Sequence, residues 1–322
     1  MIDREAWVHA PFQSIRDGFG QALLDLGADN ERIVAVGADL RDSLRMQAFA
    51  KAYPERYFEV GVAEQNLVGV AAGLAKEDLI AFAGSYAAFS PGRTHDQIRV
   101  SVCYSNRKVV VVGGHAGLSV GPDGATHQAL EDIAMMRVLP NMTVVVPSDY
   151  QSAYDLTVAA AHSPGPVYLR LSRVNSKTLP VSQPYQIGRA QVLRNGTNLT
   201  IIACGLMVDR ALELAYTLEE QFQLSVRVLN MPSIKPLDTE ALQAAAIETE
   251  NIVTIEEHQA AGGLGGAVAE WLSQHYPTPL KIIGVQDRFG HSGQAAELLD
   301  AYGFSIPEMT QDVLSLLGTR PL

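Results

Sequence analysis

Short runs of β-branched and other apolar residues alternate with amphipathic stretches through the first half of the chain. The expected strands are residues 33–36, 57–60, 79–82, 109–112, 143–146 and 167–169. The expected helices between them are residues 44–53, 64–75, 94–104, 128–138 and 150–162. Continuous apolar strands that alternate with helices are typical of a parallel sheet covered on both faces, so we predict an α/β fold.

The composition changes after this first half. Residues 174–198 are rich in Pro, Gln, Ser, Asn and Gly and show no clear period, which indicates a linker with room for an edge strand. The alternation then resumes, with strands expected at 199–203, 225–229, 252–255 and 282–283 and helices at 210–221, 239–247, 266–275 and 310–317. We therefore predict two α/β domains, a parallel-sheet domain over 1–173 and a smaller one over 199–322.

Composition and charge narrow the classes of partner. Hydrophobic residues make up 47% of the chain and the net charge is -11, which argues against nucleic acid or an anionic membrane surface. A small phosphorylated ligand stays possible, because a few local arginines suffice to bind it. Cys103 and Cys204 lie in apolar runs, as buried thiols do. No signal peptide and no run near the ~20 apolar residues of a membrane span are visible, which predicts a soluble cytoplasmic protein.

The first candidate for chemistry is Glu64, which follows the strand-like run 57–60 and begins an apolar helix-like run. A carboxylate in this position is expected to be partly desolvated, and such a group can hold or deliver a proton near neutral pH. A glutamate at a helix start can also be purely structural, because the helix dipole favours it. The next loop offers Tyr86 and Phe89, whose spacing suits either a flat heterocycle between the rings or simple core packing.

A second cluster follows the expected strand 109–112. His115 lies at the end of this strand, and Asp123 and His127 come next on a glycine-rich loop. Ligand crevices of open α/β sheets lie at the C-terminal ends of strands, so this grouping favours a functional site that handles protons. The spacing matches no standard zinc pattern, which makes a metal site the weaker interpretation.

Three further residues are candidate contacts for an anion, namely Arg16, Ser43 and Arg173. Each alone is more often a surface residue, and Ser43 is also a candidate helix N-cap. The glycine-rich segment 262–266 is similar to a phosphate loop, but it lacks a clear dinucleotide pattern. We interpret that segment as a tight strand-to-helix turn.

Several collinear segments resemble transketolase over nearly the whole chain, at 58–66, 86–93, 96–99, 121–132 and 139–149. More closely, the chain resembles the C-terminal subunit of a split, two-chain transketolase. The resemblance implies a pyrimidine-binding domain followed by a transketolase C-terminal domain, with thiamine diphosphate as the cofactor. Glu64 matches the glutamate that hydrogen-bonds N1′ of the aminopyrimidine. Tyr86 and Phe89 match the aromatic pair that packs on this ring, with Arg93 as a neighbour in the same pocket.

The resemblance also implies roles at the substrate. His115, Asp123 and His127 match catalytic positions that contact the sugar hydroxyls and carbonyl and help to move protons. Arg16, Ser43 and Arg173 match positions that hold the substrate phosphate. Three departures leave the sugar open: Pro122 stands where the single-chain enzymes usually carry Glu, His95 where an aromatic is common, and 90–93 is one residue longer.

Half of the family's cofactor machinery has no counterpart here. The family binds the diphosphate and its divalent metal, Mg²⁺ or Ca²⁺, through a Gly-Asp-Gly motif and a downstream Asn on a separate N-terminal domain. That motif does not occur in this sequence, and the chain starts where that domain should already have ended. We therefore expect a companion N-terminal subunit in a two-plus-two heterotetramer. The pair would transfer a two-carbon ketol unit from a ketose phosphate, by default a pentose phosphate, to an aldose phosphate.

Two alternatives remain at this point. The chain could be half of another thiamine diphosphate enzyme, such as a 1-deoxyxylulose-5-phosphate synthase-like enzyme or a 2-oxo acid dehydrogenase β-type subunit. The former normally carries its cofactor domain in the same chain, and the latter lacks the Asp-Gly-Ala-Thr-His-Gln loop found at 123–128. A non-catalytic partner subunit is the second alternative, and the joint retention of Glu64, His115, Asp123 and His127 argues against it.

Overall fold

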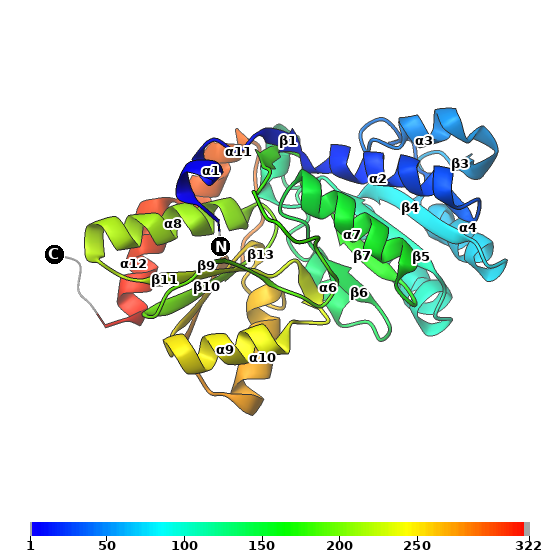
Figure 1. Ribbon diagram of the computed structural model, residues 1–322. Helices are drawn as coiled ribbons and strands as arrows, with labels where there is room; N and C mark the ends of the chain where they lie inside the picture. The colour runs from blue at the N-terminus through cyan, green and yellow to red at the C-terminus, as the bar shows by residue number, and fades with distance from the viewer. Residues whose placement is uncertain (1, 319–322) are drawn as a thin grey trace.

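The computed structural model describes residues 2–318, which form two α/β lobes (Figure 1). Residue 1 and residues 319–322, the outer ends of the two expected domains, lie outside the described residues. The first lobe contains a seven-stranded sheet of order β12-β6-β7-β5-β4-β2-β3. Its own strands are β2 (Ile33–Gly37), β3 (Tyr57–Glu59), β4 (Ile80–Tyr86), β5 (Val109–Gly114), β6 (Thr143–Val145) and β7 (Val167–Arg170), all mutually parallel.

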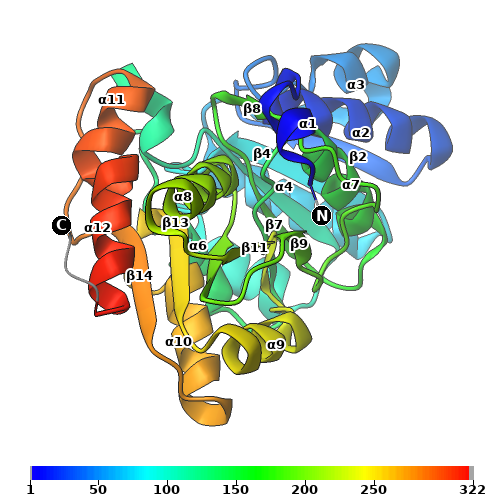
Figure 2. The same ribbon diagram turned by 60° about the vertical axis from the view of Figure 1, so that its left-hand side comes forward.

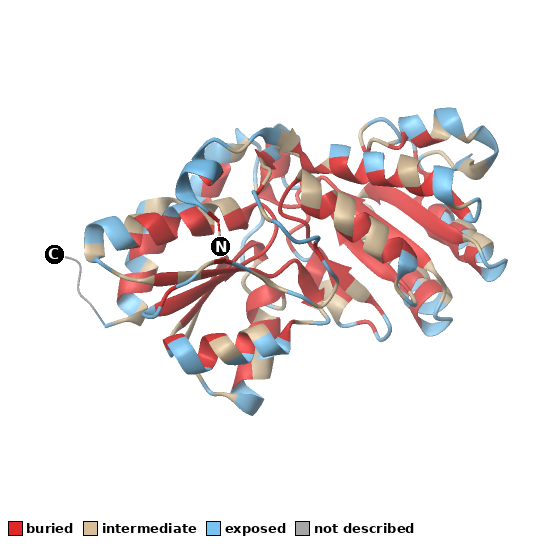
Figure 3. Ribbon diagram, viewed as in Figure 1, coloured by how far each residue is buried: buried red, intermediate tan, exposed pale blue. Residues whose placement is uncertain are grey.

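Helices cover both faces of this first sheet, because its central strands carry apolar residues on both sides. Ile33 and Ala35 of β2 join a core with α2 (Ile15–Asp29) and α7 (Tyr150–His162). Val34 and Val36 face the opposite core, with α4 (Glu64–Lys76). Figure 3 shows the central strands buried and the outer faces of the helices exposed. The remaining helices of this lobe are α3 (Gln47–Ala52), η1 (Pro54–Arg56), α5 (His95–Gln97), η2 (Ile98–Tyr104), η3 (Leu118–Asp123) and α6 (Asp132–Arg137).

The second lobe contains a five-stranded sheet of order β14-β13-β10-β11-β9. Its strands are β9 (Gln191–Arg194), β10 (Leu199–Ala203), β11 (Val226–Asn230), β13 (Ile252–Gln259) and β14 (Leu280–Val285), and only β9 is antiparallel to its neighbour. Figure 1 shows α8 (Met207–Phe222) above this sheet, and α9 (Thr239–Thr249) with α10 (Leu264–His275) below it; Figure 2 shows the same lobe from another side. The C-terminal helices are α11 (Ala295–Leu299), η4 (Asp300–Phe304) and α12 (Ile306–Leu316).

The two lobes are joined by more than their connecting segment. Strand β12 (Ser233–Lys235) belongs to the second half of the chain but pairs antiparallel with β6 of the first sheet. Near the N-terminus, Trp7 of α1 (Arg4–Val8) stacks on Tyr216 of α8 at 5.4 Å between ring centroids. Both main cores also contain residues from both lobes. The lobes therefore pack as one continuous body.

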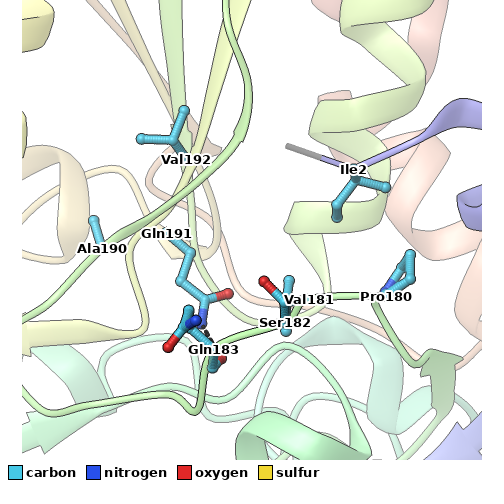
Figure 4. Close-up of a pocket in the computed structure, with 8 residues that line it drawn as sticks. All are labelled: Ile2, Pro180, Val181, Ser182, Gln183, Ala190, Gln191 and Val192. Carbon is cyan, nitrogen blue, oxygen red and sulfur yellow. Dashed lines mark hydrogen bonds between the residues drawn. The ribbon is translucent and has the colours of Figure 1, made fainter.

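The segment expected as a linker is partly structured. Residues 174–198 contain β8 (Asn175–Lys177), which pairs with β1 (Phe12–Ser14), and β9, which forms the edge of the second sheet. Between these strands lies a hollow of about 380 Å³ (Figure 4). Its lining is uncharged and contains none of the candidate site residues: Ile2, Pro180, Val181, Ser182, Gln183, Ala190, Gln191 and Val192.

Most expected elements are present, but some differ from the pattern. Helix α2 is not among the elements that the pattern predicts, because Gly18, Gly20 and Gly27 weaken its helical signal. A Cβ at Gly18 would lie 2.1 Å from the carbonyl oxygen of Tyr150, so the glycine permits close packing on α7. The expected helix 94–104 is a short α-helix followed by a π-helix, and only the second half of 128–138 is helical. Helix α3 begins at Gln47 without a side-chain cap, so the N-cap interpretation of Ser43 is wrong.

The glycine-rich segment 262–266 is a strand-to-helix turn, as the sequence indicates. The buried carboxylate of Glu256 accepts hydrogen bonds from the backbone N–H groups of Leu264 (2.6 Å) and Gly265 (2.7 Å) at the start of α10. A Cβ at Gly263 would lie 2.0 Å from this carboxylate. The protein's own carboxylate therefore occupies the place that a phosphate takes in a phosphate loop.

Two smaller expectations concern cysteines and membranes. Cys103 and Cys204 are buried free thiols, as their apolar neighbours predict. Within residues 2–318, no helix has both the length and the apolar character needed to cross a bilayer.

Candidate active site

The candidate residues gather at one edge of the first sheet. Ser43 follows β2, Glu64 follows β3, Tyr86 closes β4, His115 comes directly after β5, and Arg173 follows β7. These strands are parallel, so their C-terminal ends meet at the same edge. Ligand crevices of α/β sheets form at this edge.

Glu64 is the first residue of α4, and its side chain is 3% exposed. Its Oε2 accepts a hydrogen bond from Arg93 (2.9 Å), while Oε1 accepts none from any residue in the described part of the chain. The start of a helix favours a carboxylate, which helps to explain how it tolerates burial. Glu64 lines a pocket of about 350 Å³ formed by residues 62–66 and Arg93. One carboxylate oxygen is thus available to a ligand at a pocket wall.

Tyr86 and Phe89 form an aromatic wall next to Glu64. Their rings stack with centroids 5.9 Å apart, and the guanidinium of Arg93 lies 4.8 Å from the Phe89 ring centroid. A flat ring inserted between them would need about 7 Å, two contacts of ~3.5 Å. In this structure the two rings lie too close together to admit a flat ring between them, so a heterocycle would pack beside the pair. His115 stacks on Tyr86 at 3.9 Å and covers one face of that ring, and His127 meets Phe89 edge-on at 5.1 Å.

His115 is buried and held in its neutral form. Burial, followed by the positive charges of Arg16, Arg173 and Arg45 and by His127, lowers the pKa of its imidazole to about 3. The guanidinium of Arg16 lies 3.5 Å from Nε2, and arginine can only donate, so we infer that Nε2 accepts and Nδ1 carries the proton. Nδ1 is buried and has no hydrogen-bond partner among the residues described. His115 therefore has an N–H donor free for a ligand.

We expect His115 to stay neutral from pH 5 to pH 8. In the unfolded chain this histidine begins to bind a proton as the pH falls through ~6.5, whereas in the folded state it stays neutral because its pKa is lowered. The unfolded state is therefore favoured by proton binding, and the stability of the fold decreases as the pH drops below ~6.5. The ¹⁵N shifts of its ring in an NMR titration should show a protonated Nδ1 and no inflection in this range. His115→Gln identifies the signal. A midpoint between pH 6 and 7 would contradict the burial argument.

Arg16 joins the histidine to the loops that carry the anion candidates. It lies near the N-terminal end of α2 and donates to the backbone oxygens of Ser43 (2.7 Å) and Arg173 (2.9 Å). Arg173 in turn donates to the backbone oxygen of Val120 (2.5 Å) and to Oδ1 of Asp123 (3.3 Å). Ser43 thus takes part through its carbonyl oxygen, while its hydroxyl has no partner in the described structure.

All ten candidate residues belong to one series of contacts. The series runs through Glu64, Arg93, Phe89, His127, Tyr86, His115, Arg16, Ser43, Arg173 and Asp123. Over residues 2–318, no group of three or more His, Cys, Asp or Glu side chains is arranged to hold a metal ion. One end of the series is acidic and aromatic, and the other is cationic, which suits a heterocycle beside an anionic substrate.

Sequence reasoning missed one cation of this site. Arg45 lies close enough that its charge lowers the pKa of both Arg16 and His115, although burial is the largest cause in each case. Its side chain is held by an ion pair with Asp17 at 2.6 Å. The sequence did contain a feature that points to this cation, because Arg41 and Arg45 flank the anion candidate Ser43 in the loop that follows β2.

Comparisons with known proteins match both lobes to family models. Residues 13–178 match the family model described as transketolase, pyrimidine binding domain, and residues 188–309 match transketolase, C-terminal domain. A Methanocaldococcus jannaschii protein, provisionally named a transketolase C-terminal section, is 42% identical, with 91% of this chain and 92% of that protein covered. One subunit of an apulose-4-phosphate transketolase from Phocaeicola vulgatus is 39% identical, with 89% of this chain and 92% of that protein covered.

A solved structure matches equally well. It is described as a split gene transketolase in the form of an inactive beta4 tetramer. It superposes with a TM-score of 0.88 at 43% identity, and the alignment covers 96% of this chain and 99% of that one.

Proposed function

Because the chain belongs to the transketolase family, we propose that it is the C-terminal subunit of a two-chain transketolase. The pair would transfer a two-carbon ketol unit from a ketose phosphate to an aldose phosphate. The continuous series of contacts from Glu64 to Arg173 carries this proposal, since it places a buried carboxylate, an aromatic face and a cationic end in one site. Relatives that are themselves named as a subunit or a section support the two-chain form.

The residues present fit thiamine diphosphate, the cofactor of the family. The open Oε1 of buried Glu64 can accept a hydrogen bond from the aminopyrimidine, and the face formed by Tyr86 and Phe89 can pack on its ring. When bound, this cofactor supplies the carbanion that adds to a ketose carbonyl. In the proposal Glu64 holds a proton shared with the cofactor ring, and Arg93 orients its carboxylate through Oε2.

The remaining residues act on the substrate. Neutral His115 donates from Nδ1 to a sugar oxygen, and His127, which lies near the same Tyr86 ring, accepts or delivers a proton. Asp123 contacts the sugar hydroxyls. The guanidiniums of Arg16 and Arg173 lie at the far end of the series, where they bind the substrate phosphate. The relative named for apulose-4-phosphate supports a phosphorylated sugar as substrate. We propose that the residues lining the pocket determine which sugar is bound.

We further propose that the companion subunit holds the diphosphate and a divalent metal, Mg²⁺ or Ca²⁺. Support comes from the sequence, which contains no Gly-Asp-Gly motif, and from the split form of the relatives. The proposed assembly has two copies of each subunit. The beta4 tetramer of the solved relative shows that such a chain self-associates in that protein.

Capturing the chain from its native lysate and assaying it with and without its companion tests this proposal. We expect no turnover by the chain alone, and ketol transfer between sugar phosphates by the pair with thiamine diphosphate and Mg²⁺ added. Turnover by the chain alone at enzymatic rates would refute the two-chain form. A pair that released CO₂ from pyruvate instead would support one of the two alternative thiamine diphosphate enzymes, a 1-deoxyxylulose-5-phosphate synthase-like enzyme or a 2-oxo acid dehydrogenase.

A further inference from the structure

Three of the candidate residues lie on one loop, which the second lobe contacts directly. We call residues 115–128 the histidine loop, because it carries His115, Asp123 and His127. Its first half contains η3, whose Val120 holds Arg173 through its backbone oxygen. The position of this loop therefore determines where the two histidines lie and where the guanidinium of Arg173, the proposed phosphate contact, is held.

Glu257 reaches this loop from β13 of the second lobe. Its carboxylate is 3% exposed and accepts two hydrogen bonds from Ser119, at 2.5 Å from the backbone N–H and 3.3 Å from the hydroxyl. Gly117 has a φ of +89°, and a Cβ there would lie 2.4 Å from the carboxyl carbon of Glu257. The loop is thus shaped to receive this carboxylate at contact distance.

The surroundings keep the charge of Glu257 in place. Burial raises the pKa of the carboxyl to about 6, and the nearby Arg170 guanidinium together with the two Ser119 bonds limits the rise. Arg170 also donates to the backbone oxygen of Glu257 (2.9 Å) and pairs with Asp132 (2.7 Å), whose own negative charge adds a little to the rise. Glu257 is therefore ionised at pH 7.5, where its bonds to Ser119 are charge-assisted.

A second contact between the lobes supports the other end of the loop. The side-chain amide of Gln128 donates to the backbone oxygens of Leu118 (3.2 Å) and His291 (3.1 Å). A Cβ at Gly124 would lie 2.6 Å from the hydroxyl of Ser292. Both ends of the histidine loop thus rest on the C-terminal lobe.

We propose that Glu257 is a positioning residue, which holds the histidine loop in its working position by accepting hydrogen bonds from Ser119. This inference rests on the proposed function for its kinetic consequences, but the anchoring of the loop does not depend on it. The C-terminal lobe, which carries none of the ten candidate site residues, would then contribute to the reaction through this contact.

The test compares two identical changes on neighbouring residues. Glu257→Gln keeps an oxygen acceptor but replaces charge-assisted bonds with neutral ones, and Glu256→Gln makes the same change where the carboxylate caps α10. In the assembled enzyme we expect Glu257→Gln to raise KM for the sugar phosphate about threefold and Glu257→Ala about tenfold. Glu256→Gln should leave KM unchanged, because loss of stability alone lowers the amount of active enzyme and not its affinity.

Hydrogen–deuterium exchange of residues 115–128 gives a readout that needs no activity. We expect faster exchange in this segment for both Glu257 variants and not for Glu256→Gln. Equal exchange and equal KM in the matched pair would overturn the proposal. If Glu257→Ala fails to fold, Ser119→Ala, which removes one of the bonds from the loop side, should shift exchange in the same direction by a smaller factor. A wild-type pair without ketol transfer would refute the proposed function, while the exchange comparison would still decide the role of Glu257.

Discussion

Replacing Glu64 with Gln is expected to lower the ketol-transfer rate of the assembled enzyme by about two to four orders of magnitude. The substitution keeps the shape of the side chain, and its amide oxygen can still accept the hydrogen bond from Arg93. The amide nitrogen then faces the pocket, where Glu64 offers the unoccupied acceptor Oε1. A donor replaces an acceptor at this point, and an amide cannot hold the shared proton.

The matched control for this loss is Glu77→Gln. Glu77 is exposed at the C-terminal end of the same helix, so it undergoes the same chemical change without reaching the site. Circular dichroism and co-elution with the companion should be unchanged for both variants, because Arg93 is half-exposed and remains solvated when its charged partner is removed. Near-normal turnover by Glu64→Gln would overturn the role proposed for this carboxylate.

Replacing Arg173 with Ala is expected to raise KM for phosphorylated substrates about 10- to 100-fold, the loss of one or two charge-assisted hydrogen bonds. The guanidinium of Arg173 is partly exposed and shares the cationic end of the site with Arg16. The side chain of Arg16 donates a hydrogen bond to the backbone oxygen of Arg173. Steady-state kinetics with a sugar phosphate and with the matching unphosphorylated sugar measure the effect. The unphosphorylated sugar should show a much smaller change.

This difference between the two sugars distinguishes phosphate binding from a structural effect. Arg173 also donates a hydrogen bond to the backbone oxygen of Val120 in the histidine loop. Loosening that loop would weaken the binding of both sugars to the same extent. Arg32→Ala is a suitable control, because this exposed arginine precedes β2 at the opposite edge of the sheet. An equal rise in KM for both sugars would remove Arg173 from the phosphate site and leave it only a structural role.

Most of the first lobe could be predicted from local pattern. Helix α7 begins and ends where its apolar period indicates, and in the second lobe β10 likewise matches its apolar run residue for residue. Helix α2 could not be predicted, because its glycines serve contacts with residues far along the chain rather than its own propensity. Strand β12 could not be predicted either, since a three-residue strand finds its partner β6 only after both lobes have formed.

The candidate site divides in the same way. The sequence by itself determined which segments are candidates for chemistry, because an acidic helix start, paired aromatics and a His-rich loop are local features of residue type and spacing. It also placed them at strand ends, which a parallel sheet brings to one edge. Only the tertiary structure decided that Tyr86 and Phe89 form a single face, that Arg45 joins the cations and that Glu257 anchors the histidine loop. These are contacts between residues distant along the chain, and their geometry depends on packing that no local pattern contains.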